Sequence, residues 1–214
     1  YTSLLWEPNE YINIMVYPFT DSQILGISTF PYSLKNFFLE GTQQVSASWI
    51  TLENLSFPYC ISINSSYIYE QSTDERINQN DAAITLAHEL GHYLGLRHVF
   101  SEGGTTSMCT DTDYCKDTPS YNRSEYEQWL NNLDKQNKYQ LKDLAKRYSC
   151  EKGEYEAHNI MDYAYCFYNE ITLEQRKRIR HILNYSPLIP GPKESRIDTR
   201  GVQGRLNLPI CIMK

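Results

Sequence analysis

The sequence predicts an α+β fold, with strands gathered in the first third of the chain and helices in the remainder. Three observations support this prediction. Apolar and polar residues alternate in residues 11–19 and 59–69, helical patterns follow from residue 81 onward, and 214 residues is the length of one domain. A domain of this size also accommodates two lobes around a cleft.

Two segments in the first third have the pattern of strands. The stretch "YINIMVYPF" (11–19) alternates ahead of Pro18, and "YCISINSSYIY" (59–69) alternates again. Residues 33–40 fit a short helix, while residues 46–57 are compatible with either a helix or a strand.

Residues 81–94 have the clearest start and stop signals of a helix. Asn80 or Asp81 is the expected N-cap, and Gly95 is expected to end the helix. The apolar residues at helical spacing are Ala83, Ala87, Leu90 and Leu94.

Two capping-box patterns predict the later helices. Ser124 with Glu127 opens residues 124–149, which we expect to form one or two helices after a loop at 101–123. Thr172 with Gln175 opens residues 172–185. The expected buried face of this last helix consists of Ile179, Ile182 and Leu183.

The chain beyond residue 186 is rich in proline, with four of the nine prolines at positions 187, 190, 192 and 209. We expect residues 187–214 to run extended over the surface, with Cys211 as an anchor.

Charge and hydropathy exclude several classes of partner. The formal net charge of −6 gives no basic field for nucleic acid, and no stretch approaches the length of a membrane span. The basic residues Arg176, Lys177, Arg178 and Arg180 lie within a helical pattern, which favours a solvated helix face over a nucleic-acid patch. No signal segment is present in this sequence, which does not start with Met.

The cysteines indicate an oxidising compartment. The six are Cys60, Cys109, Cys115, Cys150, Cys166 and Cys211, and no two of them form a C-x-x-C pair. Disulfides explain an even, dispersed set better than a structural zinc site does, and free buried thiols are the alternative. A secreted, cell-surface or periplasmic location follows from this interpretation.

The stretch "HELGHYLGLRH" (88–98) concentrates three of the five histidines of the chain. On the predicted helix His88 and His92 are one turn apart, so both imidazoles project from the same face and can reach one metal ion. Glu89 lies about 100° round the helix, where its carboxylate can touch a metal-bound water without being a ligand.

Gly95 is what makes a third ligand available. Catalytic zinc takes three protein ligands and leaves a position for water. A left-handed glycine at position 95 would turn the chain back and bring His98 beneath the metal. The alternative is a set of core histidines, but H-E-x-x-H arises by chance in about 1% of such chains, and the added glycine and histidine lower this by roughly a thousandfold.

The complete motif, H-E-x-x-H-x-x-G-x-x-H, resembles the zinc signature of the metzincin metallopeptidases, whose second mark is a methionine turn. Here "HNIMDYAYC" (158–166) places Met161 63 residues after His98. Together with "CTDTDYCKDTP" (109–119) and "ITLEQRKRIRHIL" (171–183), it resembles the pappalysin family and its ulilysin-like branch. The resemblance covers residues 11–185.

The resemblance implies a metzincin-like catalytic domain over residues 1–186. Its upper lobe, about 1–95, would hold a mixed twisted sheet and the active-site helix. Its lower lobe, about 96–186, would be helical and disulfide-bearing, with residues 120–149 as a helical insertion, and 187–214 would be the tail.

The resemblance also implies a role for each residue of the site. The zinc ligands would be His88, His92 and His98. Glu89 would polarise the zinc-bound water and carry its proton to the leaving amine. Met161 would form the hydrophobic floor, and Tyr163 would donate a hydrogen bond to the tetrahedral intermediate. Taken alone, Tyr163 is better explained by packing.

Further cofactor and covalent features follow from the same resemblance. Asp113, Asp117 and Thr118 match a segment where relatives bind calcium, although surface loops are often acidic without an ion. The family order of cysteines would pair Cys109 with Cys150 and Cys115 with Cys166.

We therefore expect a zinc-dependent endopeptidase acting on a protein or peptide substrate. The substrate would add a strand to a sheet edge formed by residues 59–69. An inactive zinc-binding module and a zinc amidase acting on cell-wall peptides are the alternatives. The sequence does not indicate an oligomeric state.

Overall fold

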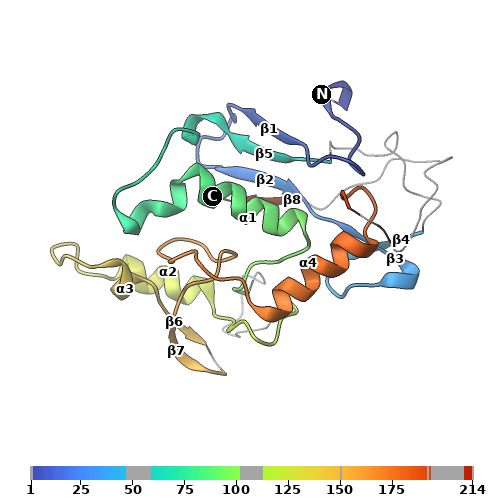
Figure 1. Ribbon diagram of the computed structural model, residues 1–214. Coiled ribbons are helices and arrows are strands. Elements are labelled where there is room, and N and C mark those ends of the chain that lie inside the picture. Colours follow the sequence, from blue (N-terminus) through green and yellow to red (C-terminus); the bar gives the residue numbers. More distant parts are fainter. Residues whose placement is uncertain are drawn as a thin grey trace.

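The principal sheet of the computed structural model has four strands in the order β1-β5-β2-β8 (Figure 1). The model describes residues 2–46, 59–101, 113–149, 151–191, 193 and 210–213. The strands are β1 (Ile14–Tyr17), β2 (Gly26–Thr29), β5 (Ile61–Asn64) and β8 (Ile210–Met213). β1 is parallel to β5, whereas β2 is antiparallel to both of its neighbours. The sheet is therefore mixed, as expected.

Both predicted strand segments are confirmed, but the second is shorter and lies inside the sheet. β5 ends at Asn64 because the Asn64 side chain accepts a hydrogen bond from the Ser66 backbone and starts the 3-10 turn η5 (Ser65–Tyr67). β5 pairs with β1 on one side and β2 on the other. The prediction that 59–69 forms a free edge for substrate is therefore wrong. Residues 47–57 of the ambiguous segment lie outside the described residues.

A smaller two-stranded sheet flanks the first. β3 (Tyr32–Leu34) and β4 (Gln43–Val45) pair in parallel, and the 3-10 turn η2 (Lys35–Phe37) lies between them. The short helix expected in 33–40 is thus one 3-10 turn. Another 3-10 turn, η1 (Thr2–Leu4), lies near the N-terminus.

Helix α1 (Ala82–Tyr93) lies beneath the principal sheet and contacts β2, β5 and β8 (Figure 1). It follows the 3-10 segment η6 (Glu75–Asn80). The largest cluster of buried residues lies between the sheets, α1 and α4 (Leu173–Tyr185). Among its members are Tyr32, Tyr59, Ile61, Tyr93, Ile182 and Ile189.

The segment predicted as one or two helices forms two short helices and a strand. α2 (Arg123–Asn131) and α3 (Leu141–Leu144) precede β6 (Lys146–Ser149), which pairs with β7 (Gly153–Glu156). The N-cap of α2 is Asn122, whose side chain accepts from the Glu125 backbone, so the predicted cap at Ser124 is wrong by two residues. In β6 burial alternates from residue to residue, as a strand requires.

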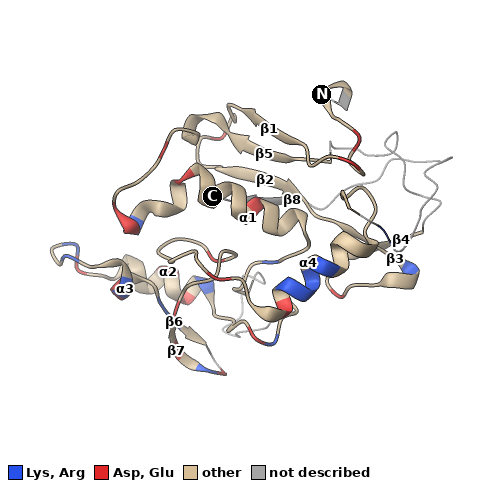
Figure 2. Ribbon diagram, in the orientation of Figure 1, with Lys and Arg blue, Asp and Glu red and all other residues tan. Residues whose placement is uncertain are grey.

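Helix α4 begins with the predicted capping box, because the Thr172 and Gln175 side chains each bond the other's backbone. Ile182 is fully buried, as expected. Arg178 departs from the expected solvated face. Its guanidinium is buried and donates to the carbonyls of Gly95 and Glu40, while the other basic residues of the run are exposed. Figure 2 shows the basic positions of α4 in blue.

The segment after residue 186 contributes to the fold in two places. Leu188 and Ile189 are buried in the core, and the Tyr93 hydroxyl donates to the Leu188 carbonyl at 3.3 Å. Residues 210–213 then form β8, which pairs with β2. Among the described residues, no helix is both long enough and apolar enough to cross a bilayer.

The cysteines do not form the implied pairs within the described residues. Cys115 and Cys166 are both free and buried, so their predicted pairing is wrong. The Cys166 thiol instead donates to the carbonyls of Ala157 and Asn159. Cys60 is also free, and β2 separates its segment from Cys211 on β8, about two strand spacings apart. Cys109 and Cys150 lie outside the described residues.

Candidate metal centre

The turn after α1 has the hydrogen bonds of a Schellman motif. The Leu96 N–H donates to the Gly91 carbonyl at 2.9 Å, and the Gly95 N–H donates to the His92 carbonyl at 2.9 Å. Gly95 has a φ of +87°, a left-handed conformation that glycine adopts without steric cost. The sequence-predicted end of the helix is thus confirmed.

This turn brings His98 back to the helix. Its Nε2 lies 3.0 Å from Nε2 of His92, which lies 3.1 Å from Nε2 of His88. One ligand nitrogen from each histidine lies within 4.8 Å of the others, and all three residues are buried. A search of the described residues for three or more His, Cys, Asp or Glu side chains that could hold a metal ion finds this group.

The hydrogen bonds of the rings indicate which nitrogens are free to bind a metal. Nδ1 of His88 lies 2.8 Å from the Ile160 carbonyl, and Nδ1 of His92 lies 2.8 Å from the Leu96 carbonyl. A carbonyl only accepts, so both rings carry their proton on Nδ1 and turn the Nε2 lone pair toward the other histidines. Ligand nitrogens of a tetrahedral zinc site lie about 3.4 Å apart. The donor set therefore fits one zinc ion.

Burial keeps these imidazoles neutral. It lowers the pKa of His88 to about 4 and lowers the pKa of His92 and His98 well below the usual value. Because a metal binds only the unprotonated nitrogen, the low pKa values prepare the site for a cation at neutral pH.

Glu89 is buried between α1 and the sheet. The backbone of β2 passes so close that a Cβ added to Gly26 would lie 2.6 Å from Cγ of Glu89. Glycine at position 26 thus allows the sheet to approach the Glu89 side chain. The close packing limits the positions that the carboxylate can take.

Met161 packs against α1 at Gly91. It is fully buried, and a Cβ on Gly91 would lie 2.3 Å from its sulfur. The Met161 carbonyl accepts from the Val99 N–H at 3.3 Å, which joins this turn to the segment carrying His98. Met161 thus packs against α1, and its role as the floor of the metal site stays a prediction.

Tyr163 lies among the metal-site rings, with its ring centroid 4.5 Å from that of His98 and 5.5 Å from that of His88. Its side chain also packs on Phe100 at 4.9 Å, and the Arg123 guanidinium lies 4.6 Å from the ring centroid. The tyrosine predicted from the sequence is thus beside the histidines.

The residues predicted to bind calcium are engaged elsewhere. Asp113 accepts from the Cys115 N–H and the Thr118 hydroxyl, so these side chains satisfy one another. Asp117 accepts from the Thr172 hydroxyl and the Glu174 N–H at the start of α4. Among the described residues, this segment therefore gives the calcium prediction no support.

Sequence reasoning missed Gly26 and Gly91, the two glycines that let other groups approach the helix. Gly91 left a signal, because a glycine costs about 1 kcal/mol inside a helix and is kept there for a packing reason. Gly26 left none, since its contact with Glu89 joins segments 63 residues apart.

Comparison with known proteins finds similar proteins over this region. The family model described as pregnancy-associated plasma protein-A, of the M43 peptidases, matches residues 40–184. Proteins named extracellular metalloprotease from Arthroderma benhamiae and Trichophyton verrucosum are each 37% identical over 108 residues, covering 49% of this chain and 32% of the relative. The chain thus spans about a third of the length of these curated relatives.

A solved structure is similar to most of the chain. Mature mirolysin of Tannerella forsythia, in complex with a cleaved peptide, covers 82% of this chain and 53% of its own, with 21% sequence identity and a TM-score of 0.44.

Proposed function

The chain belongs to the M43 peptidases, the family of pregnancy-associated plasma protein-A, and from this membership we propose that it is a zinc-dependent endopeptidase. The observation that carries the proposal is the convergence of three neutral, buried imidazoles on one position, with a glutamate beside the first of them. The proposed zinc ligands are Nε2 of His88, His92 and His98.

When bound, zinc supplies Lewis-acid polarisation of the scissile carbonyl and lowers the pKa of a water molecule toward about 7. Glu89 is the general base in this proposal. Its carboxylate takes a proton from the attacking water and delivers it to the nitrogen of the leaving amine. Such a proton transfer contributes about 10² to 10⁴ in rate.

Tyr163 is proposed to orient the reacting group. Its position beside His88 and His98 suits donation from its hydroxyl to the oxygen on which charge develops. Phe100 and Arg123 also pack against the Tyr163 ring. Their contacts limit the directions in which its hydroxyl points.

We further propose that the protein acts outside the cytoplasm on protein or peptide substrates. The relatives from Arthroderma benhamiae and Trichophyton verrucosum carry the name extracellular metalloprotease, which supports secretion. The free thiols Cys60, Cys115 and Cys166 do not oppose this, because burial raises the pKa of each and so reduces its reactivity.

The proposal is tested by Glu89→Gln with zinc content measured in the same preparation. We expect one zinc per chain and a loss of cleavage of an unfolded protein by about 10² or more. Glu75→Gln, which changes an exposed glutamate, is the control and should cleave normally. Unchanged turnover in Glu89→Gln would refute the mechanism. Turnover of peptidoglycan fragments without cleavage of peptides would favour the amidase.

A further inference from the structure

A buried ion pair lies behind the turn that carries Tyr163, and the mechanism above does not use it. Nε of Arg147 on β6 lies 3.4 Å from Oδ2 of Asp162, and the two side chains are 0% and 1% exposed. Removing two charges from water costs several kcal/mol each, so a buried pair is weak evidence for stability alone. The other hydrogen bonds of this pair indicate what it does.

The two side chains together hold both peptide groups of Tyr163. Nη2 of Arg147 donates to the Tyr163 carbonyl at 3.2 Å and to the Ala164 carbonyl at 2.8 Å. Oδ1 of Asp162 accepts from the Tyr163 N–H at 2.7 Å and from the Tyr121 hydroxyl at 2.5 Å. The position of the Tyr163 backbone is therefore fixed from both sides.

The backbone after Tyr163 needs this support. Ala164 and Tyr165 have φ values of +41° and +42°, in the left-handed region. Such a conformation costs a residue with a Cβ about 1–2 kcal/mol. A planar guanidinium that donates to successive carbonyls offsets this cost. A lysine ammonium could not match its geometry.

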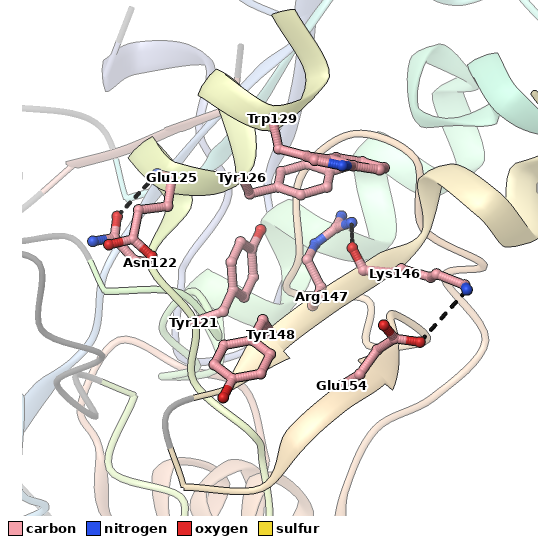
Figure 3. A pocket seen from close by; sticks show the side chains of 9 residues that line it. All are labelled: Tyr121, Asn122, Glu125, Tyr126, Trp129, Lys146, Arg147, Tyr148 and Glu154. Atoms are coloured by element: carbon pink, nitrogen blue, oxygen red, sulfur yellow. Dashed lines mark hydrogen bonds and ion pairs between the residues drawn. The ribbon is translucent and has the colours of Figure 1, made fainter. Parts of the chain in front are cut away.

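Two tyrosine rings hold the guanidinium in place. The Arg147 guanidinium carbon lies 3.7 Å from the ring centroid of Tyr126 and 5.1 Å from that of Tyr121 (Figure 3). These residues also line a cavity of about 280 Å³ beside α2 and the β6–β7 hairpin, with Trp129 and Tyr148 among its other lining residues. Arg147 thus links Tyr121 and α2 to the turn that carries Tyr163.

We infer that Arg147, with Asp162, is a positioning residue for the reaction. It fixes the backbone of Tyr163 and through it the direction of the tyrosine hydroxyl, without contact with the substrate. This inference rests on the proposed function, in particular on the role of Tyr163.

A double-mutant cycle tests it. Arg147→Lys should keep one zinc per chain and lower kcat by about 10- to 100-fold at little change in KM, because a small displacement of a positioning group has an effect of this size. In the Tyr163→Phe background the same substitution should lower kcat by less than about threefold, since the hydroxyl it positions is already absent.

Equal losses of kcat in the two backgrounds would overturn the inference, because Arg147 would then act on the fold as a whole. An unchanged kcat in Tyr163→Phe would overturn it as well, while a dead Glu89→Gln enzyme would still support the proposed function. If Arg147→Lys does not fold, Asp162→Asn, which keeps the shape of the side chain, replaces it in the same cycle.

The pairing of β8 carries a second, independent inference. β2 is the strand that passes against Glu89, and β8 covers its outer edge, with Met213 opposite Gly26 and Ile212 opposite Ile27. The same segment lies against α1. The backbone of residues 210–213 thus follows the sheet edge beside the general base.

Extended peptides bind proteins by adding a strand to a sheet edge, with backbone hydrogen bonds as the main contacts. Next to Glu89, the strand edge with which a substrate could pair is that of β2, because β5 already pairs with β1 and β2. We propose that residues 210–213 occupy the position of an extended peptide substrate and inhibit the enzyme in cis. This inference also rests on the proposed function.

Removal of residues 208–214 tests the inhibition. A segment that occupies the site most of the time lowers the apparent affinity for substrate in proportion. We expect KM for an extended peptide to fall about tenfold with little change in kcat, and a synthetic peptide of residues 207–213 to inhibit the shortened chain competitively. Met213→Pro, which removes a backbone donor opposite Gly26 that faces β2, should lower KM in the full chain. Ile212→Pro is its matched control, because the Ile212 N–H points away from β2, and it should leave KM unchanged.

An unchanged KM in both Met213→Pro and the shortened chain would overturn the inference on β8 alone. If the shortened chain does not fold, Met213→Pro decides the question in the full chain. Absence of turnover in every variant would overturn the proposed function with it.

Discussion

Residues 88–98 and residues 113–118 both had the sequence pattern of a metal site, and they fold differently. The three histidines of the first segment meet at one position, with Nε2 atoms 3.0–3.1 Å apart along the series. The acidic side chains of the second segment do not meet at one position. Asp113 turns to Thr118 within the loop, whereas Asp117 turns outward to cap α4.

The difference shows what makes a spacing informative. In an α-helix, residues four apart always share a face, so His88 and His92 converge without help from the rest of the fold. A loop has no such rule, and a carboxylate satisfies the nearest backbone donors instead. The close spacing of Asp113 and Asp117 therefore carried little geometric information.

Removal of the third histidine should have the largest effect. His98→Ala leaves two ligands, and we expect zinc affinity to fall by more than about 100-fold, because loss of even an outer hydrogen-bond partner of a ligand costs 10- to 100-fold. Competition with a chelator of known affinity measures this. His158→Ala removes a histidine outside the cluster and should leave zinc binding unchanged. Equal affinity in the two variants would contradict the three-ligand site.

Acid should destabilise the metal-free protein. Burial lowers the pKa of His88 to about 4 from an unfolded value near 6.5, so between these pH values the unfolded chain binds more protons than the folded one. The contribution of neutral His88 to the free energy of unfolding is thus fully present above about pH 6.5. It is lost as the pH decreases toward 4, which lowers the free energy of unfolding by about 3 kcal/mol.

Urea unfolding of the metal-free protein at pH 7.5 and pH 5 measures this effect. His88→Gln should reduce the difference between the two conditions. An identical free energy of unfolding of the original protein at both pH values would contradict the burial of these imidazoles.

Gly95→Ala should weaken both the fold and the metal site. The φ of +87° strains any residue with a Cβ, and that Cβ would lie 2.7 Å from Cγ1 of Ile182. We expect a loss of about 2 kcal/mol and a lower zinc affinity. Gly153→Ala is a matched control, since its φ is +74° but no atom lies within 4 Å of the added Cβ. It should lose less stability and bind zinc normally.

Asp117→Ala should have the smallest effect. Loss of the bonds to Thr172 and Glu174 at the N-terminus of α4 should cost about 1 kcal/mol. Addition of calcium should raise the melting temperature of neither the original protein nor the variant. A calcium-dependent rise that Asp117→Ala abolishes would restore the calcium prediction.

The parts of the fold that local pattern determines could be predicted from the sequence. The α+β class, helix α1 with its stop at Gly95, the capping box of α4 and the strand β1 all follow from periodicity and caps. The family resemblance rested on residues 88–98, 109–119, 158–166 and 171–183, and the M43 model matches residues 40–184, which contain them.

The rest depended on contacts between distant segments. β5 looked like an edge strand because the sequence does not show that β2 pairs with it, and β8 looked like a surface tail because its partner lies about 185 residues away. Likewise, no local pattern shows that Arg147 approaches Asp162, and the thiols of Cys115 and Cys166 face different carbonyls.

X-ray absorption at the zinc edge of the zinc-loaded protein tests the metal centre most directly. We predict three imidazole nitrogens and one further light atom at about 2.0–2.1 Å, with loss of one imidazole in His98→Ala. A sulfur ligand at about 2.3 Å, or an unchanged spectrum in His98→Ala, would contradict the assignment of zinc to His88, His92 and His98.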